Sequence, residues 1–575
     1  MQNVSLIFLA FFTFSIAFAQ AQTHRIEEIK YPSGKRLSQT SYLDSIPDGD
    51  FISWYETGRI MEKGSYSMGK KIGTWVYLYP NGDSLSLFNY ENGPYIIWFD
   101  NKQITVKGLV VNGEKEGKWT EYFINGKVKS TITYKTGKPF GKQTHFDENG
   151  TKTLEFTLPD GSYQAWYSTG EIKEKGNLKD EARDGLWVGF YKNGKPNYEG
   201  YYSNGTETGI WKEFYFNGQV KKVEPLTDGT YNEYYIDGKM GAEGQVVQGK
   251  RTGVWTWYYN DGKTKEIVKY LNGLRNGDSK RYYESGQLEF DGAYENDSLN
   301  GYAHWYYPNG NLEMEGNSIN DLQDSVWKFY YDNGRMGSTG AFKKGRMEGE
   351  WVYYYMAGPL WKKGSYSSDI KDGMWVTYWE NGKVLQQGAY QTGQESGLWE
   401  SWYDNGQIKD RGTFVLGVMN GKWVGWFKDG TPNYEFMYKN GVKTGFCTQY
   451  YSNGKVKYKG GFLDGQRHGK FAEYYNTGAP LSSGKYLNGK QFGKWSYFDN
   501  FGKLYKKQTL KDGKPDGKWV EYYANGKKKG EGVYKDLLKH GVWTYYDQTG
   551  KVVYKVQYNR GVKEKEIVNS QKGIQ

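Results

Sequence analysis

Residue types that build catalytic and metal sites are scarce in this sequence. It has one cysteine, Cys447, so it can form no internal disulfide and no cysteine-based metal site. None of its histidines are spaced as metal ligands: His24, His145, His304, His468 and His540. Sequence motifs of zinc proteases, serine hydrolases and phosphate-binding loops are also missing. We therefore predict that the protein is not an enzyme and has no catalytic residue, no metal and no cofactor.

Long apolar runs are missing as well, apart from Leu6–Ala19. This run is too short to span a bilayer comfortably as a helix and ends in Ala17-Phe18-Ala19, an A-x-A cleavage signal. No lipobox cysteine follows it. We interpret residues 1–19 as a secretory signal peptide cleaved near Ala19, and expect an exported protein that is periplasmic, outer-envelope-associated or secreted.

Leucine, isoleucine and valine are too few to build the core, whereas 18% of the residues are aromatic. Disordered chains are poor in aromatic residues, so the low mean hydropathy of −0.85 does not indicate disorder. The net charge of +11 is small over 575 residues, and its charges are interspersed. We expect a core of tryptophan and tyrosine beneath solvated charged faces, and no nucleic-acid partner.

What the sequence contains instead is one pattern repeated from end to end, typified by Gly373–Ser396. Numbered from Gly373, the unit has Gly at 1, Trp at 3, aromatics at 6 and 7, Asn-Gly at 9 and 10, an apolar residue at 12, Gly at 16 and Tyr at 18. Units begin every 24 residues from Gly253 to Gly541. Earlier units begin at Gly49, Gly73, Gly93, Gly117, Gly141, Gly161, Gly185, Gly209 and Gly229, with three steps of 20 residues.

The repeat divides the chain into four parts. We predict a signal peptide at 1–19, a cap with a degenerate half-repeat at 20–48, about twenty-two repeats at 49–562, and a charged tail at 563–575.

The Asn-Gly pairs predict that each unit is a β-hairpin. Asn381-Gly382 suits a two-residue type I′ turn, in which both central residues have positive φ. That turn sets position 7 opposite 12, 5 opposite 14, 3 opposite 16 and 1 opposite 18. Trp375 then faces Gly388, and its indole can cover a strand position that has no side chain. The fold class is therefore all-β, an elongated single-layered antiparallel array of about forty-five strands.

The three short steps remove four residues, an even number that keeps every side chain on its face. The remaining segments, Tyr90–Tyr95, Leu158–Tyr163 and Leu226–Tyr231, each predict a two-residue Asn-Gly or Asp-Gly hairpin.

Several residues depart from the pattern or recur at one position of it. Gln143, Ser279, Ala303 and Cys447 replace the position-3 aromatic, and we expect Cys447 to be a small buried core residue. If an active site exists, Gln143, Ser279 and Ala303 are where it would lie. His468 and His540 precede position 1, which predicts a role in a turn. Glutamates recur at position 5, where we expect cross-strand pairs with position 14 rather than catalysis: Glu121, Glu213, Glu233, Glu473 and Glu521.

The most plausible binding residues are tryptophans at position 6, on the face opposite position 3. Such side chains can stack on sugar rings, or can simply pack the second face of the sheet. They are Trp54, Trp98, Trp166, Trp402 and Trp426.

The unit resembles the MORN repeat in its bacterial variant form, for example at Lys518–Lys527 and at Gly349–Tyr355. The resemblance implies an elongated antiparallel β-array that scaffolds proteins or lies near membranes, without catalytic residues. We expect a non-catalytic scaffold that mediates protein–protein interaction in the cell envelope or outside the cell. The alternatives are binding to glycans or the cell wall, binding to an anionic membrane surface, and an antitoxin-like role, since chains of this kind are often labelled YwqK-type antitoxins.

Overall fold

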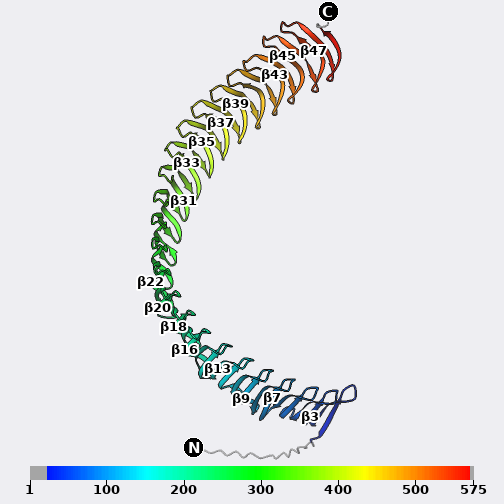
Figure 1. Ribbon diagram of the computed structural model, residues 1–575, viewed down its shortest axis with the longest axis vertical. Coiled ribbons are helices and arrows are strands. Elements are labelled where there is room, and N and C mark those ends of the chain that lie inside the picture. Colours follow the sequence, from blue (N-terminus) through cyan, green and yellow to red (C-terminus); the bar gives the residue numbers. More distant parts are fainter. Residues whose placement is uncertain (1–21, 570–575) are drawn as a thin grey trace, which may run out of the picture. The chain divides into compact units, whose positions relative to one another are not determined.

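The computed structural model describes residues 22–569, which form forty-nine strands. That range contains no helix and hence none that could cross a membrane. The all-β prediction is confirmed, with four more strands than expected. Apart from its repeat units, the chain divides into two large compact units: the first unit extends up to Leu274 and the second unit begins at Arg275. Within each of these two large units, the strands follow one another along an open antiparallel sheet (Figure 1).

The strands of the first unit are β1 (His24–Lys30), β2 (Arg36–Leu43), β3 (Ile46–Trp54), β4 (Ile60–Ser67), β5 (Lys70–Leu78), β6 (Ser84–Asn89), β7 (Gly93–Trp98), β8 (Ile104–Val111), β9 (Glu114–Tyr122), β10 (Val128–Lys135), β11 (Lys138–Pro139), β12 (Gly141–Phe146), β13 (Lys152–Leu158), β14 (Gly161–Trp166), β15 (Ile172–Lys179), β16 (Ala182–Phe190), β17 (Pro196–Ser203), β18 (Thr206–Phe214), β19 (Val220–Pro225), β20 (Gly229–Tyr234), β21 (Met240–Val247), β22 (Lys250–Tyr258) and β23 (Thr264–Leu271).

The remaining strands are β24 (Leu274–Tyr282), which starts at the division, and β25 (Leu288–Glu295), β26 (Ser298–Leu299), β27 (Gly301–Tyr306), β28 (Leu312–Ile319), β29 (Leu322–Tyr330), β30 (Met336–Lys343), β31 (Arg346–Tyr354), β32 (Leu360–Ser367), β33 (Ile370–Tyr378), β34 (Val384–Gln391), β35 (Gln394–Trp402), β36 (Ile408–Val415), β37 (Val418–Trp426), β38 (Pro432–Lys439), β39 (Val442–Tyr450), β40 (Val456–Leu463), β41 (Gln466–Tyr474), β42 (Pro480–Leu487), β43 (Lys490–Phe498), β44 (Leu504–Lys511), β45 (Lys514–Tyr522), β46 (Lys528–Lys535), β47 (Leu538–Tyr546), β48 (Val552–Asn559) and β49 (Val562–Asn569).

The predicted register holds along the strands but fails beside the turn. In the hairpin β33–β34, Gly373 pairs with Tyr390, Trp375 with Gly388 and Thr377 with Gln386, as expected. Next to the turn, however, Tyr378 at position 6 pairs with Val384 at position 12, after a shift in register. Position 7 is therefore outside the strand, and the prediction that it faces position 12 is wrong.

The Asn-Gly turn is not of type I′. Gly382 N–H donates to Trp379 O at 2.9 Å, and Trp379 N–H to Lys383 O at 2.8 Å. Of the three residues between them, only Gly382 has a positive φ, 80°. This is a three-residue loop in which a tight turn is followed by a glycine bulge. The Asn381 side chain stabilises the loop, because its Oδ1 accepts from Lys383 N–H at 3.1 Å. Its Nδ2 also donates to Asp404 O, in the next repeat, at 2.7 Å.

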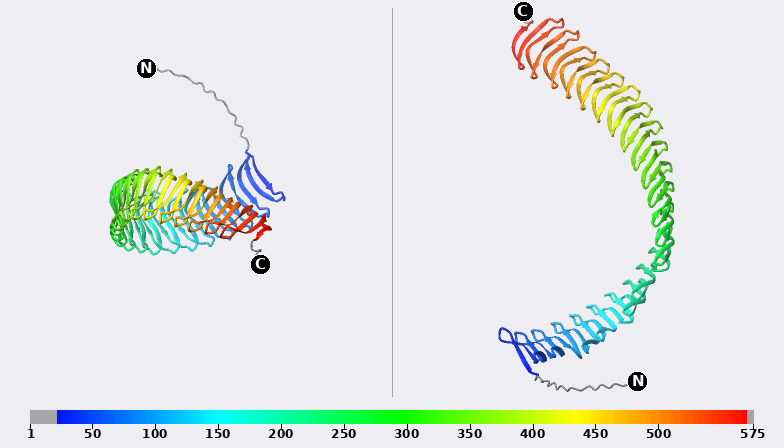
Figure 2. Two further views of the ribbon diagram at one scale, coloured as in Figure 1. Left: turned by 90° about the horizontal axis from the view of Figure 1, so that it is seen from above. Right: turned by 180° about the vertical axis from the view of Figure 1, so that it is seen from behind.

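The two-residue turns lie at the other edge of the sheet, between successive units. Thr392 and Gly393 connect β34 to β35, and both have positive φ, 48° and 81°. Equivalent turns recur throughout the array, many with Asn or Asp at the first position. Outside the three short steps, a repeat thus has a three-residue loop at one edge, the loop edge, and a two-residue turn at the other, the turn edge. The connections between strands run along these two edges of the sheet (Figure 2).

The three short steps also differ from their prediction. Gly93, Gly161 and Gly229 are the first residues of β7, β14 and β20 rather than turn residues. The connections before them consist of residues 90–92, 159–160 and 226–228. The flanking strands still pair antiparallel, as Leu87 with Ile96 shows, so the expectation that the sheet stays intact is confirmed.

Both ends of the array differ from the predicted boundaries. β1 and β2 form a whole hairpin with the same loop, closed by Gly34 N–H to Tyr31 O at 2.9 Å, and not a half-repeat. Residues 563–569, assigned to a charged tail, lie in β49, which pairs with β48. The predicted signal peptide lies outside the described residues.

The core is formed by the position-3 tryptophans, but each indole covers a glycine of the preceding unit. Trp375 is 4% exposed. A Cβ added to Gly364 would lie 2.2 Å from Trp375 Cδ2, so the ring occupies the space above that glycine. The indole Nε1 donates to Ser365 O at 3.0 Å. The same seat is occupied by Trp75, Trp119, Trp187, Trp211, Trp255, Trp327, Trp351, Trp399, Trp423, Trp495 and Trp543. The prediction that each indole covers the opposing glycine of its own hairpin is therefore wrong. The indoles instead pack neighbouring repeats against each other.

Position-18 rings continue this core from unit to unit. In the second unit an uninterrupted edge-to-face series has centroid distances of 5.0–6.3 Å: Trp327, Phe342, Trp351, Tyr366, Trp375, Tyr390, Trp399, Phe414 and Trp423. Cations at position 23 cover several indoles from solvent, as Lys71 covers Trp75 at 3.7 Å and Lys371 covers Trp375 at 4.6 Å. Many of the basic residues are therefore part of the core packing, not only of a solvated face.

Candidate interaction surfaces

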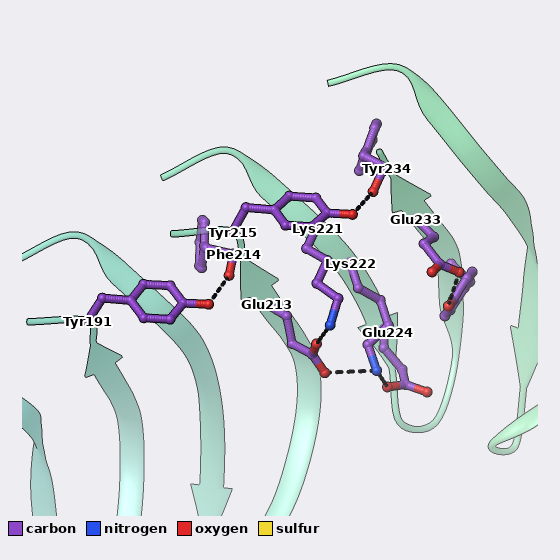
Figure 3. Close-up of polar contacts among 10 residues, drawn as sticks. Tyr191, Glu213, Phe214, Tyr215, Lys221, Lys222, Glu224, Glu233 and Tyr234 are labelled. Carbon is purple, nitrogen blue, oxygen red and sulfur yellow. Dashed lines mark hydrogen bonds and ion pairs between the residues drawn. The ribbon is translucent and has the colours of Figure 1, made fainter. Parts of the chain in front are cut away.

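The loop edge is closed by the position-7 tyrosines, whose role the sequence did not reveal. Tyr191 Oη donates to Phe214 O at 2.7 Å, and Tyr215 Oη donates to Tyr234 O at 2.8 Å (Figure 3). Each bond reaches the position-6 carbonyl of the following unit. Other donors of the same kind are Tyr31, Tyr55, Tyr79, Tyr167, Tyr235, Tyr283, Tyr307, Tyr331, Tyr355, Tyr403, Tyr451, Tyr475 and Tyr523. This edge is occupied by contacts within the chain.

The position-5 glutamates form ion pairs and hydrogen bonds, only partly as predicted. Glu213 contacts Lys222, at position 14, and Lys221, at position 13, both at 3.0 Å (Figure 3). Burial alone would raise the pKa of the Glu213 carboxyl, but these two lysines hold that pKa below its ordinary value. Glu473 accepts from Ser482, at position 14, at 3.1 Å.

The other three glutamates lie opposite position 14 in the strand register, as predicted, but their side chains contact other residues. Glu121 and Glu521 lie 3.7 and 3.9 Å from position-13 lysines, Lys129 and Lys529. Glu233 accepts a hydrogen bond from Tyr231, two residues before it on the same strand. A bulge next to the loop brings positions 13 and 14 near the same carboxylate, which explains the change of partner.

The departures at position 3 are buried and packed. Gln143 is 1% exposed, and its side-chain amide bonds with the backbone of Thr133, Phe140 and Gly141. Beside Ala303, the Phe290 ring covers Gly292 in place of the absent indole. Cys447 is completely buried, as predicted, and burial raises the pKa of its thiol. Ser279 is also buried, at 1% exposed.

The histidines are not in turns. His468 and His540 lie within β41 and β47, where the strand bulges next to Gly469 and Gly541, so the predicted turn role is wrong. In both, Nδ1 is buried and has no hydrogen-bond partner among the described residues. Within residues 22–569, no three His, Cys, Asp or Glu side chains are grouped to hold a metal ion.

The predicted binding tryptophans are half-buried and mostly far apart in sequence. Trp54, Trp98 and Trp166 end β3, β7 and β14, whereas Trp402 and Trp426 end β35 and β37 in successive units. The main-chain oxygens of the last two accept hydrogen bonds at the loop edge. Trp402 O accepts from Trp379 Nε1 at 3.2 Å, and Trp426 O accepts from Tyr403 Oη at 3.0 Å. A role of these five side chains in binding stays a prediction.

The turn edge of the second unit carries an exposed apolar row that the sequence analysis missed. It comprises Val415, Leu416, Val418, Val442, Leu463 and Leu487, each 43–64% exposed. Leu416 lies in a two-residue turn, and the other five are strand residues that flank this turn or the turns of the following repeats. Leu416 has φ 49°, a left-handed conformation that is rare for a bulky side chain. A large apolar residue is thus kept where it is both exposed and strained.

Leu416→Asn is expected to raise the free energy of unfolding by about 0.5–1 kcal/mol, because asparagine tolerates a left-handed conformation and Asn-Gly suits a two-residue turn. Val418→Asn, at a neighbouring exposed strand position, is the control and is expected to lower stability. Denaturant unfolding of both variants checks this. A loss of stability on Leu416→Asn would contradict the proposed strain.

Comparison with known proteins identifies the repeat. The family model described as the MORN repeat variant matches residues 115–136, 183–204, 207–225, 251–272, 275–296, 299–320, 371–392, 395–415, 443–464, 515–536 and 539–560. No curated protein matches the chain.

Two solved structures are similar at low identity. The crystal structure of TcdB2-TccC3-Cdc42 is 10% identical, with 94% of this chain and 32% of that chain covered and a TM-score of 0.12. The crystal structure of TcdB2-TccC3-TEV is 9% identical, with 92% and 33% covered and a TM-score of 0.10. The chain therefore spans about a third of the length of these proteins.

Proposed function

Because the chain is a MORN repeat protein, and such repeats typically act as scaffolds for interactions with proteins or membranes, we propose that it is a non-catalytic scaffold that binds protein partners in the cell envelope or outside the cell. The observation that carries the proposal is the apolar row on the turn edge. Exposed apolar side chains in a continuous row are typical of protein–protein contacts. Leu416 keeps its place in this row despite its left-handed backbone, which favours a selected contact over chance exposure.

The proposed location rests on the signal peptide predicted for residues 1–19. An exported chain would meet its partners in the periplasm, at the outer envelope or in the medium. Fractionation of cells that produce the chain, with N-terminal sequencing of the recovered protein, tests this part. A cytoplasmic chain with an intact N-terminus would contradict it.

Immobilised protein, incubated with envelope extract, tests the scaffold role. A variant with L416N, V442T, L463T and L487T replaces four of the six apolar side chains of the row. A matched control with V326T, M374T, L398T and V542T removes four apolar side chains that are 47–57% exposed at position 2. We expect the wild type and the control to retain the same proteins and the row variant to lose them. Retention of the same proteins by the row variant, or of none by the wild type, would contradict the proposal.

A further inference from the structure

The sheet face opposite the indoles carries a row of lysines on six consecutive strands of the second unit. They alternate with the core-facing residues of their strands and are all exposed: Lys459 in β40, Lys470 in β41, Lys485 in β42, Lys494 in β43, Lys507 in β44 and Lys518 in β45. Lys470 and Lys485 pair directly across the ladder, and Lys507 pairs with Ser496, two residues after Lys494. We call these six residues the lysine row.

The lysine row lacks the partners that neutralise the same face elsewhere. Only Lys518 approaches a carboxylate, that of Glu531 at 3.8 Å, and the other five form no ion pair in residues 22–569. In β35–β38, by contrast, Arg411 lies 2.6 Å from Glu400 and Lys422 lies 2.8 Å from Glu435. Like charges directly opposite each other in a sheet are destabilising. Folding therefore does not account for the row.

The row lines two neighbouring hollows in the sheet surface. One has a volume of about 670 Å³ and includes Lys459, Lys470, Lys485 and Lys494; the other, about 390 Å³, includes Lys494, Lys507 and Lys518. They share Lys494 and Ser496 and so form one continuous groove. Its floor consists of small residues such as Ala472, Ser483 and Ser496, and its first hollow is flanked by Phe446 and Phe492, which are 61% and 42% exposed.

We propose that the lysine row binds an acidic polysaccharide laid across the strands. Adjacent strands lie about 4.8 Å apart, and Lys470 lies directly opposite Lys485. The other neighbouring lysines of the row are offset by two residues along their strands, so the row crosses the sheet in a zigzag. A ligand that follows them is a linear polymer with closely spaced negative charges. The phenyl rings of Phe446 and Phe492 offer apolar surfaces to sugar rings, and the serine hydroxyls of the floor offer hydrogen bonds to sugar hydroxyls. This site goes beyond the proposed scaffold role, because it uses a different surface from the turn edge.

Titration calorimetry of the full chain with polygalacturonate tests the proposal, with neutral dextran as the uncharged polymer. The groove variant is K470Q, K485Q, K494Q and K507Q. The control is K179Q, K250Q, K343Q and K439Q, four exposed lysines outside the groove that carry no ion pair in the described residues. We expect wild type and control to bind polygalacturonate, with an affinity that falls as salt rises. The groove variant should bind at least tenfold more weakly, and dextran should not bind.

Three results would overturn the assignment. The first is a groove variant that binds within twofold of the wild type. The second is poly-glutamate or single-stranded DNA bound as tightly as polygalacturonate, which would indicate an acidic peptide or a nucleic acid. The third is anionic phospholipid vesicles bound tightly by the wild type without any binding of polygalacturonate, which would indicate a membrane surface.

A single charge reversal separates binding from folding. Lys470→Glu places a carboxylate directly opposite Lys485, so the thermal midpoint should stay equal or rise. Binding of polygalacturonate should nevertheless fall at least tenfold. A Lys470→Glu variant with the affinity of the wild type would overturn the proposal.

Discussion

Gly388→Ala is expected to destabilise the second unit by about 1–3 kcal/mol, the usual cost of forcing extra volume into a packed core. The new Cβ would lie 2.2 Å from Trp399 Cδ2, and an indole held by its neighbours on both sides has no space to withdraw. Gly388 does not have a positive φ, so the loss would come from the collision and not from the backbone. Denaturant unfolding measures it.

Gly337→Ala is the matched control. Gly337 also lies in a strand of the second unit without a positive φ, but the nearest atom to its added Cβ is at 3.4 Å, on Tyr331. This variant should unfold close to the wild type. Equal effects of the two substitutions would show that the indoles are not seated on glycines of the preceding unit.

The largest single loss is expected for Trp375→Ala, about 3–5 kcal/mol for a buried aromatic side chain. Removing the ring abolishes its edge-to-face contacts with Tyr366 and Tyr390, at 5.1 and 6.3 Å, and its hydrogen bond to Ser365 O. Lys371, which covers the ring at 4.6 Å, would lose its aromatic partner. Trp402→Ala, at a half-buried position 6, should cost clearly less.

The damage from Trp375→Ala should also stay local. In a repeat array each unit is stabilised by its own strands and its immediate neighbours. Amide hydrogen exchange should therefore accelerate in β32–β35 and remain as in the wild type in β43–β45. Uniform acceleration across the second unit would contradict this expectation and indicate one cooperative domain.

The sequence was sufficient to predict the fold because the repeat period and the alternation of side chains are local properties. The pairing of Trp375 with Gly388 follows from strand alternation and from the even number of residues, 376–387, that lie between them. The type I′ prediction for the Asn-Gly turn was wrong, because Asn-Gly is also compatible with a glycine bulge. Thr392-Gly393, which forms the two-residue turn, is a weaker signal than Asn381-Gly382.

Contacts between units could be predicted less well. Trp375 has two glycine neighbours across the sheet, Gly388 within its hairpin and Gly364 in the hairpin before, and the one-dimensional pattern does not tell which one the ring covers. The bond from Tyr355 to Tyr378 O depends on position 7 lying outside the strand, which in turn depends on the turn type. The lysine row and the apolar row were overlooked because both become visible only when corresponding positions of neighbouring units are brought side by side.

The contacts between units also bear on how such a chain changes length during evolution. The indole bond to a main-chain oxygen spans ten residues, as from Trp375 to Ser365, and the tyrosine bond spans twenty-three, as from Tyr355 to Tyr378. Gain or loss of one full period therefore restores both bonds wherever recombination cuts the gene. Even the loss of four residues is accommodated, since Tyr215 still reaches Tyr234, nineteen residues away. Genes of this type can thus be extended or trimmed by unequal crossing-over without selection for particular breakpoints.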